Sequence, residues 1–84
     1  MEIKAVEALL QTNLQAVHAQ LSTRDTVHFE ALIVSDRFEG VSRVKRQQLV
    51  YETLGPLITS GEMHAIALKL YTVAEWKQKE HQNG

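Results

Sequence analysis

The chain has 84 residues, of which nine are basic and ten acidic, with a formal net charge of −1 and no cysteine. This length allows one domain around one modest hydrophobic core. The near-neutral charge excludes a surface that is basic throughout, so binding to nucleic acid or to an anionic membrane would depend on local clusters. Without cysteine, this chain can supply neither a disulfide nor a thiolate metal ligand. We find no basic leader followed by an apolar run and no apolar stretch near the ~20 residues that span a bilayer, and therefore expect a cytoplasmic domain without membrane contact.

The first half of the chain predicts one helix and two strands. Apolar residues at helical spacing predict a helix over about 2–12, which Thr12-Asn13 would end because Asn tolerates the left-handed conformation. Strands are predicted over 14–21 and 27–35, the second rich in β-branched and aromatic residues. The short polar segment between them predicts an antiparallel hairpin.

The second half begins with a predicted loop over 36–40. A helix follows, which Ser42 would cap and which is expected to end near Leu54 because Gly55-Pro56 breaks it. A short helical turn over 57–59, a third strand over 64–71 and a last helix over 73–79 follow, the last begun by the capping box Thr72 to Glu75. This order predicts an α+β sandwich with two helices between the second and third strands. Its three-stranded mixed sheet would have helices over one face, within a single domain of residues 1–80 and a flexible tail of 81–84.

Basic residues gather around the start of the second predicted helix. A helix N-terminus carries roughly half a positive charge, so cations there are locally unfavourable and indicate a use other than stability. Three interpretations stay open: a face that binds carboxylates of a protein partner, a face that binds phosphates of nucleic acid, or a solvated helix surface. Nearby acidic residues and the lack of a Gly-x-x-Gly loop speak against nucleic acid. The basic residues are Arg37, Arg43, Lys45 and Arg46.

Two separate segments resemble signatures of the BolA-like family. The first is Ser35-Asp36-Arg37-Phe38-Glu39-Gly40 with Ser42 to Gln47 and Val50-Tyr51, and the second is His64-Ala65 leading to Tyr71-Thr72 and Glu75-Trp76. The pair His28-Phe29 also matches the family, and the chain is most similar to its short bacterial branch, of the IbaG/YrbA type.

The resemblance implies a BolA-like fold related to the class II KH domain. It implies a monothiol glutaredoxin as partner and a [2Fe-2S] cluster that is held only in the complex with glutaredoxin and glutathione, with none in the isolated chain. The role would be iron-sulfur trafficking or an iron and stress response, by a protein that is a monomer or weak homodimer alone. Some family members are described as transcriptional regulators, so DNA binding through the basic helix is the alternative function.

The resemblance also assigns roles to histidines. From the residues alone His64 reads as a half-buried strand histidine, but it falls on the family's C-terminal His, which implies that it is the cluster ligand. Many relatives carry a second ligand in the loop between the first two strands, where this chain has neither Cys nor His in 22–26. His28, just past that loop, is the candidate second ligand, with a structural strand histidine as the other interpretation.

Two aromatic residues, Phe38 and Trp76, are interpreted as core. The sequence contains no recognisable catalytic set, and we expect a protein that is not an enzyme.

Overall fold

The computed structural model describes residues 1–63 and 65–83, and His64 and Gly84 lie outside the described residues. Its strands form one sheet in the order β1-β2-β3, with β1 antiparallel and β3 parallel to β2. The predicted mixed sheet and antiparallel hairpin are therefore confirmed. The elements are α1 (Ile3–Asn13), β1 (His18–Thr23), β2 (His28–Val34), the 3-10 turn η1 (Asp36–Phe38), α2 (Arg43–Thr59), β3 (Ala65–Tyr71) and α3 (Val73–Asn83).

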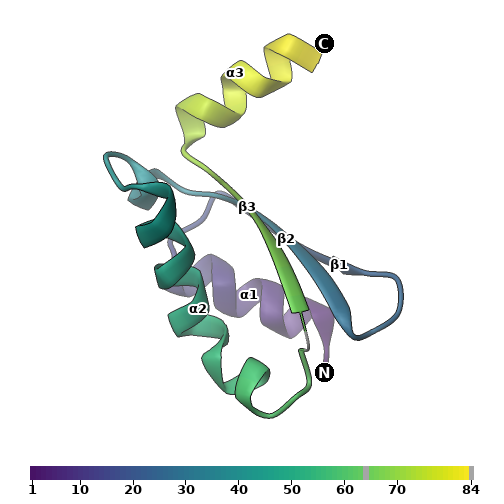
Figure 1. Cartoon of the computed structure of the whole chain (residues 1–84). Coiled ribbons are helices and arrows are strands. Elements are labelled where there is room, and N and C mark those ends of the chain that lie inside the picture. Colours follow the sequence, from purple (N-terminus) through teal and green to yellow (C-terminus); the bar gives the residue numbers. More distant parts are fainter. Residues whose placement is uncertain (64, 84) are drawn as a thin grey trace.

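The core lies between one face of the sheet and the helices α1 and α2, which Figure 1 shows together on that side. Successive strand residues point to opposite faces, so Phe29, Ala31 and Ile33 of the central strand are all buried. Their neighbours on the edge strands share this face, with Leu21 beside Ala31 on one side and Leu68 on the other. From the helices, the residues that complete this core include Val6, Leu10, Val50 and Leu54. Phe38 is 0% exposed, which confirms its core assignment.

The connection between α1 and β1 differs from the prediction. The residue in the left-handed region is Gln15, with φ 49°, and not Asn13, which is still helical. Leu14 and Ala16 are buried in the core, so the chain stays against the helix layer and enters the sheet only at His18. The predicted strand start at residue 14 was therefore wrong.

The predicted break at Gly55-Pro56 was also wrong, because α2 runs without interruption to Thr59, and the described residues between α2 and β3 form no separate helical turn. Proline removes one helical N–H and costs about 3 kcal/mol in a helix interior. Leu54 is fully buried and Leu57 packs against the same core, so continuing the helix buries apolar side chains on both sides of Pro56. Burial of such a side chain contributes about 1.5–3 kcal/mol, enough to offset the missing hydrogen bond.

The capping box at the start of α3 is confirmed. The Thr72 hydroxyl accepts the N–H of Glu75 at 3.1 Å, and the Glu75 carboxylate accepts the N–H of Thr72 at 2.8 Å. The helix does not end near Lys79 but continues to Asn83, past the predicted tail boundary at residue 80. Figure 1 shows α3 extending from the end of β3, away from α1 and α2. No helix in the described part of the chain is both long and apolar enough to cross a bilayer.

Candidate functional site

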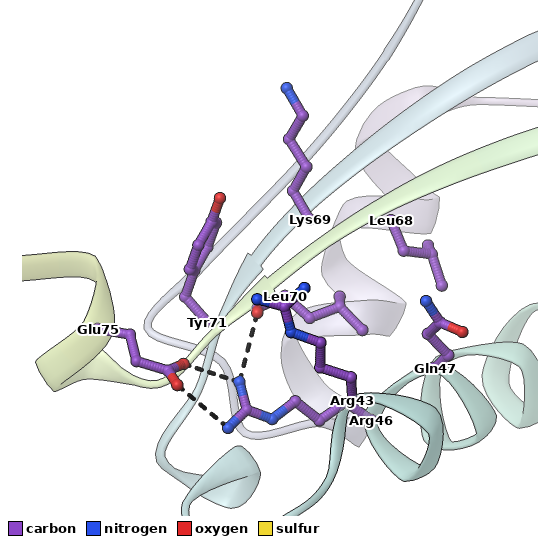
Figure 2. A pocket seen from close by; sticks show the side chains of 8 residues that line it. All are labelled: Arg43, Arg46, Gln47, Leu68, Lys69, Leu70, Tyr71 and Glu75. Carbon is purple, nitrogen blue, oxygen red and sulfur yellow. Dashed lines mark hydrogen bonds and ion pairs between the residues drawn. The ribbon is translucent and has the colours of Figure 1, made fainter. Parts of the chain in front are cut away.

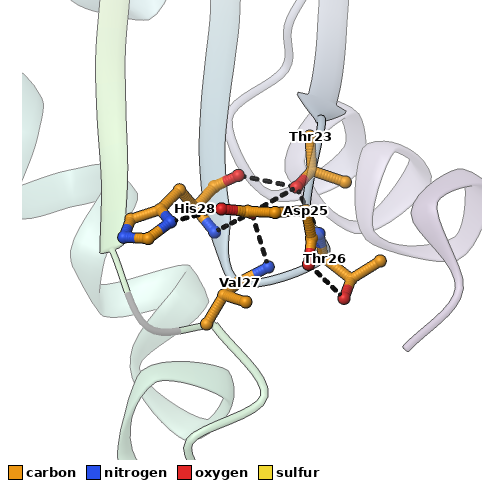
Figure 3. Close-up of polar contacts among 5 residues, drawn as sticks. All are labelled: Thr23, Asp25, Thr26, Val27 and His28. Carbon is orange, nitrogen blue, oxygen red and sulfur yellow. Dashed lines mark hydrogen bonds and ion pairs between the residues drawn. The ribbon is translucent and has the colours of Figure 1, made fainter.

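The turn between β1 and β2 is organised by the carboxylate of Asp25 (Figure 3). Its Oδ1 accepts the backbone N–H groups of Val27 at 2.9 Å and His28 at 2.8 Å, while its Oδ2 accepts from the ring Nδ1 of His28 at 2.6 Å. The hydroxyl of Thr23 accepts the N–H of Thr26 and donates to the carbonyl of His28. These bonds hold Thr26 at φ 64°, a left-handed conformation that is unfavourable for a β-branched residue. The turn is thus a fixed support for the His28 ring.

The contact with Asp25 determines which nitrogen of His28 carries the proton. Hydrogen bonds from the backbone of His28, from its ring and from the backbone of Val27 hold the pKa of Asp25 well below its usual range. An ionised carboxylate only accepts hydrogen bonds, so Nδ1 of His28 must be the donor. In the neutral ring, Nε2 then keeps its lone pair, on a side chain that is 70% exposed. In metal-binding histidines, the ring nitrogen that does not bind the metal usually donates its N–H to a carboxylate or carbonyl, as Nδ1 of His28 does here.

His28 lies at the point where β3 enters the sheet. It is the register partner of Ala65, and the N–H of Ala65 donates to the carbonyl of Val27. The other predicted ligand, His64, lies outside the described residues. Among the described residues, no group of three or more His, Cys, Asp or Glu side chains is arranged to hold a metal ion.

The basic residues lie at the other end of β3, where Arg46 is part of the fold. Its guanidinium pairs with both carboxylate oxygens of Glu75, at 2.7 and 3.3 Å, and donates to the carbonyl of Leu70 (Figure 2). It also donates to the carbonyl of Val41, at 2.8 Å. The Arg46 side chain is only 11% exposed, and its guanidinium lies over the Phe38 ring. This pairing lowers the pKa of Glu75 to about 2, with the N–H of Thr72 as the next cause. Arg46 therefore joins α2, β3 and α3.

The other three basic residues are placed differently. Arg37, on η1, donates to the carbonyl of Asn13 at the end of α1 and so helps to close that helix. Arg43 and Lys45 are exposed in the first turn of α2 and make no ion pair among the described residues. The predicted cluster therefore divides: an ion pair ties Arg46 into the fold, Arg37 makes one exposed hydrogen bond, and Arg43 and Lys45 make no ion pair among the described residues.

An open groove of about 330 Å³ lies between the start of α2, the end of β3 and the start of α3. Figure 2 shows Arg43 and Arg46 both extending from α2 toward β3, with Gln47 facing Leu68. Its lining residues are Arg43, Arg46, Gln47, Leu68, Lys69, Leu70, Tyr71 and Glu75.

Comparison with known proteins assigns the family. Residues 1–75 match the model of the BolA-like protein family. The chain belongs to the BolA-like family. It is 38% identical to the acid stress protein IbaG of Escherichia coli K12, over 100% of this chain and 99% of that protein. It is 40% identical to an uncharacterized protein of Haemophilus influenzae, over 93% of this chain and 91% of that protein.

Solved structures agree with this BolA-like assignment. BolA1 from Arabidopsis thaliana superposes with a TM-score of 0.79 at 31% identity, covering 89% of this chain and 98% of that one. A bol-like protein from Babesia bovis superposes with a TM-score of 0.81 at 28% identity, covering 95% and 94%. The predicted family, its short bacterial branch and the BolA-like fold are therefore confirmed.

Sequence reasoning gave no role to the partners of two functional candidates in this BolA-like protein. Asp25 stands three positions before His28, a spacing that an Asx-type turn can bring together, so a local signal was available. Glu75 was recognised as part of the capping box and of the second signature, but its pairing with Arg46 was not, because it joins residues 29 positions apart and depends on the tertiary fold.

Trp76 occupies the opposite face of the sheet from α1 and α2. It stacks on His18, with ring centroids 6.4 Å apart, and lies 5.5 Å from Tyr71 at a tilted angle. The Trp76 side chain is half-buried. His18 and Tyr71 flank the fully buried Val34 in the strand register, so all three belong to this same face of the sheet. Trp76 is thus a packing residue, but on the face opposite the main core.

Proposed function

We propose that this protein is a BolA-like adaptor that binds a monothiol glutaredoxin and shares a [2Fe-2S] cluster with it. The observation that carries the proposal is the His28 ring, which the Asp25 carboxylate holds by Nδ1 at 2.6 Å at an exposed end of the sheet. Family membership supports the same role, and the name of the E. coli relative supports placing it in a stress response.

The residues fit a ligand set that is shared between two proteins. Because the chain contains no Cys, imidazole nitrogen is the one side-chain donor of intermediate softness that it can offer to iron. His64 is the proposed ligand and His28 the proposed second ligand, while glutaredoxin and glutathione supply thiolates. When bound, the cluster supplies a transferable and redox-active iron-sulfur unit. The contribution of this chain is to present a neutral ring nitrogen in a fixed orientation and, through Asp25, to keep the proton on the other nitrogen.

Arg43 and Lys45 are the proposed docking residues for the protein partner. They are exposed and make no ion pair within the described residues, so they are available to carboxylates. The DNA-binding alternative uses the same basic helix. Since Arg46 is paired with Glu75, the charge left on this helix for phosphates is smaller than the sequence suggested. This difference favours the protein partner, because DNA binding strength increases with the number of neutralised phosphates.

The test is co-expression with a monothiol glutaredoxin, followed by size-exclusion chromatography and a visible absorption spectrum of the co-eluting pair. We expect a coloured heterodimer. The double variant Arg43→Glu/Lys45→Glu should weaken the pair by about tenfold through reversed charge. The control Lys4→Glu/Lys77→Glu, with the same change in net charge on exposed residues of α1 and α3, should leave it unchanged. Unchanged glutaredoxin binding together with lost DNA binding in the first variant would assign the function to DNA regulation instead.

A further inference from the structure

The two edge strands of the sheet differ in what pairs with their outward backbone groups. On β1, the backbone N–H of Leu21 points away from β2 and donates to the carboxylate of Glu7 on α1, at 2.9 Å. A helix side chain therefore occupies this edge. Exposed edges are the places where a sheet can accept another strand, and natural proteins cover or block them for that reason.

Within the described part of the chain, the outer edge of β3 carries backbone groups that no other strand pairs. The N–H of Ala65 and the carbonyl of Tyr71 both bond toward the β2 side, to the carbonyl of Val27 and the N–H of Ser35. Because residues alternate along a parallel ladder, the residues between them with outward backbone groups are Ile66, Leu68 and Leu70. Of these groups, the Leu70 carbonyl accepts from Arg46, at 3.5 Å. No backbone-to-backbone bond among residues 1–63 and 65–83 joins this edge to another segment.

The groove beside this edge is lined by apolar side chains on β3 and by arginine side chains on α2. Leu68 and Leu70 are half-buried and line it together with Gln47. Two of its charges are already neutralised, since Arg46 pairs with Glu75 at 2.7 Å and Lys69 pairs with Glu30 at 3.0 Å. Arg43 is the lining charge that makes no ion pair within the described part of the chain. The groove thus combines strand-pairing groups, apolar contacts and one available guanidinium.

We infer that the outer edge of β3 binds an extended acidic peptide segment of a partner protein by strand addition. The outward N–H and carbonyl groups of Ile66 and Leu68 and the N–H of Leu70 would pair with its backbone, and Arg43 would bind one of its carboxylates. The inference rests on the docking role of Arg43 in the proposed function and extends it from a charged contact to backbone pairing.

The charges favour this occupant over two others. A second copy pairing through β3 would place no acidic side chain of that strand near Arg43, because Ala65–Tyr71 contains none. A single-stranded nucleic acid carries a phosphate at every nucleotide, for which one unpaired guanidinium in the groove is a poor match. An acidic strand satisfies both the regular backbone groups and the unpaired charge.

The experiment uses the isolated, isotope-labelled protein without glutaredoxin or cluster, so its failure would leave the proposed function standing. The probe is a short blocked peptide in which valine alternates with glutamate, followed by NMR and amide hydrogen exchange. We expect protection of the amides of Ile66, Leu68 and Leu70, with little change at Ala67 and Lys69, whose N–H groups already face β2. Arg43→Glu should weaken binding about tenfold, whereas Lys4→Glu, an equal charge change on α1, should not.

Three results would overturn the inference. The alternating amides could stay unprotected at saturating peptide, which would mean that no strand is added. They could be protected without peptide as protein concentration rises, which would assign the edge to a second copy. An unstructured oligonucleotide could protect them at physiological salt where the peptide does not, which would assign the edge to nucleic acid.

Discussion

At the scale of single residues, the ability of His28 to bind a metal depends on which ring nitrogen carries the proton. The carboxylate of Asp25 accepts from Nδ1, so the neutral ring should carry its proton there and leave Nε2 unprotonated. In Asp25→Asn, the side-chain amide can present an N–H to Nδ1 instead, and the proton should move to Nε2. Long-range proton–nitrogen correlation spectra at neutral pH distinguish the two forms directly.

The exposed His18 ring is an internal reference for this measurement, since it stacks on Trp76 and has no carboxylate partner among the described residues. Its tautomer distribution should be the same in both proteins. A wild-type His28 with its proton on Nε2 would contradict the assigned geometry and remove the main support for His28 as a ligand.

At the scale of elements, the continuous helix α2 contains two weak positions. A Cβ at Gly55 would meet no atom within 4 Å, and Gly55 is absent from the residues with positive φ. Gly55→Ala should therefore raise the free energy of unfolding by about 0.5–1 kcal/mol. Pro56→Ala restores a helical N–H and should raise it by about 1–2 kcal/mol, less than the full proline penalty because proline also stiffens the unfolded chain.

Urea denaturation followed by circular dichroism measures both changes. If Pro56→Ala destabilised the protein, the helix would have to depend on the proline for its shape, and the continuous α2 described here would be wrong.

The ion pair between α2 and α3 should make the stability of the fold depend on pH. The Arg46 guanidinium holds the pKa of Glu75 at about 2, below the usual 4.5. A carboxylate whose pKa is depressed in the folded state stabilises the protein at pH values above its usual pKa. For Glu75 that contribution is lost as the pH falls from about 4.5 toward 2. Because the Glu75 side chain is 48% exposed, solvent screens the pair, and we expect roughly 1 kcal/mol at neutral pH.

Thermal or urea unfolding of wild type and Glu75→Gln across pH 2 to 7 tests this. The stability difference should be full at neutral pH and should disappear near the acid end of the range. Glu80→Gln is the control, an exposed residue of α3 that has no ion pair among the described residues. A difference that stayed constant with pH would show that the α3 attachment does not depend on the Arg46–Glu75 pair.

At the scale of the whole molecule, the two candidate functional regions lie toward opposite ends of β3. His28 is the register partner of Ala65 at its start, while the groove with Arg43 lies along residues 68–71 near its end. Strands rise about 3.3 Å per residue, so a partner that contacts both regions must extend roughly 10–20 Å along the strand. Charge reversal at Arg43 and removal of His28 should therefore affect different parts of one interface: docking strength in the first case and cluster retention in the second.

Much of this architecture could be predicted from local patterns. A segment rich in β-branched and aromatic residues identified β2, and Thr72 with Glu75 identified the start of α3. The failures have tertiary causes: burial of Leu54 and Leu57 carried α2 through Pro56, and burial of Leu14 delayed β1. At the site, the resemblance supplied His28 and the charge pattern supplied the basic residues, but only the fold showed that Arg46 is tied to Glu75 while Arg43 makes no ion pair among the described residues. The role of His64 stays a prediction.

The most direct test of the central claim is the visible spectrum of the co-expressed pair with a monothiol glutaredoxin when His64 is replaced. His64→Ala should leave a folded protein whose pair with glutaredoxin has lost or destabilised its cluster, seen as bleaching of the visible bands. His28→Ala should have a smaller effect, and His81→Ala, an exposed residue near the end of α3, should have none. If His64→Ala retains the wild-type spectrum and the wild-type rate of cluster loss, His64 is not a ligand, and the shared-cluster mechanism proposed for this chain is wrong.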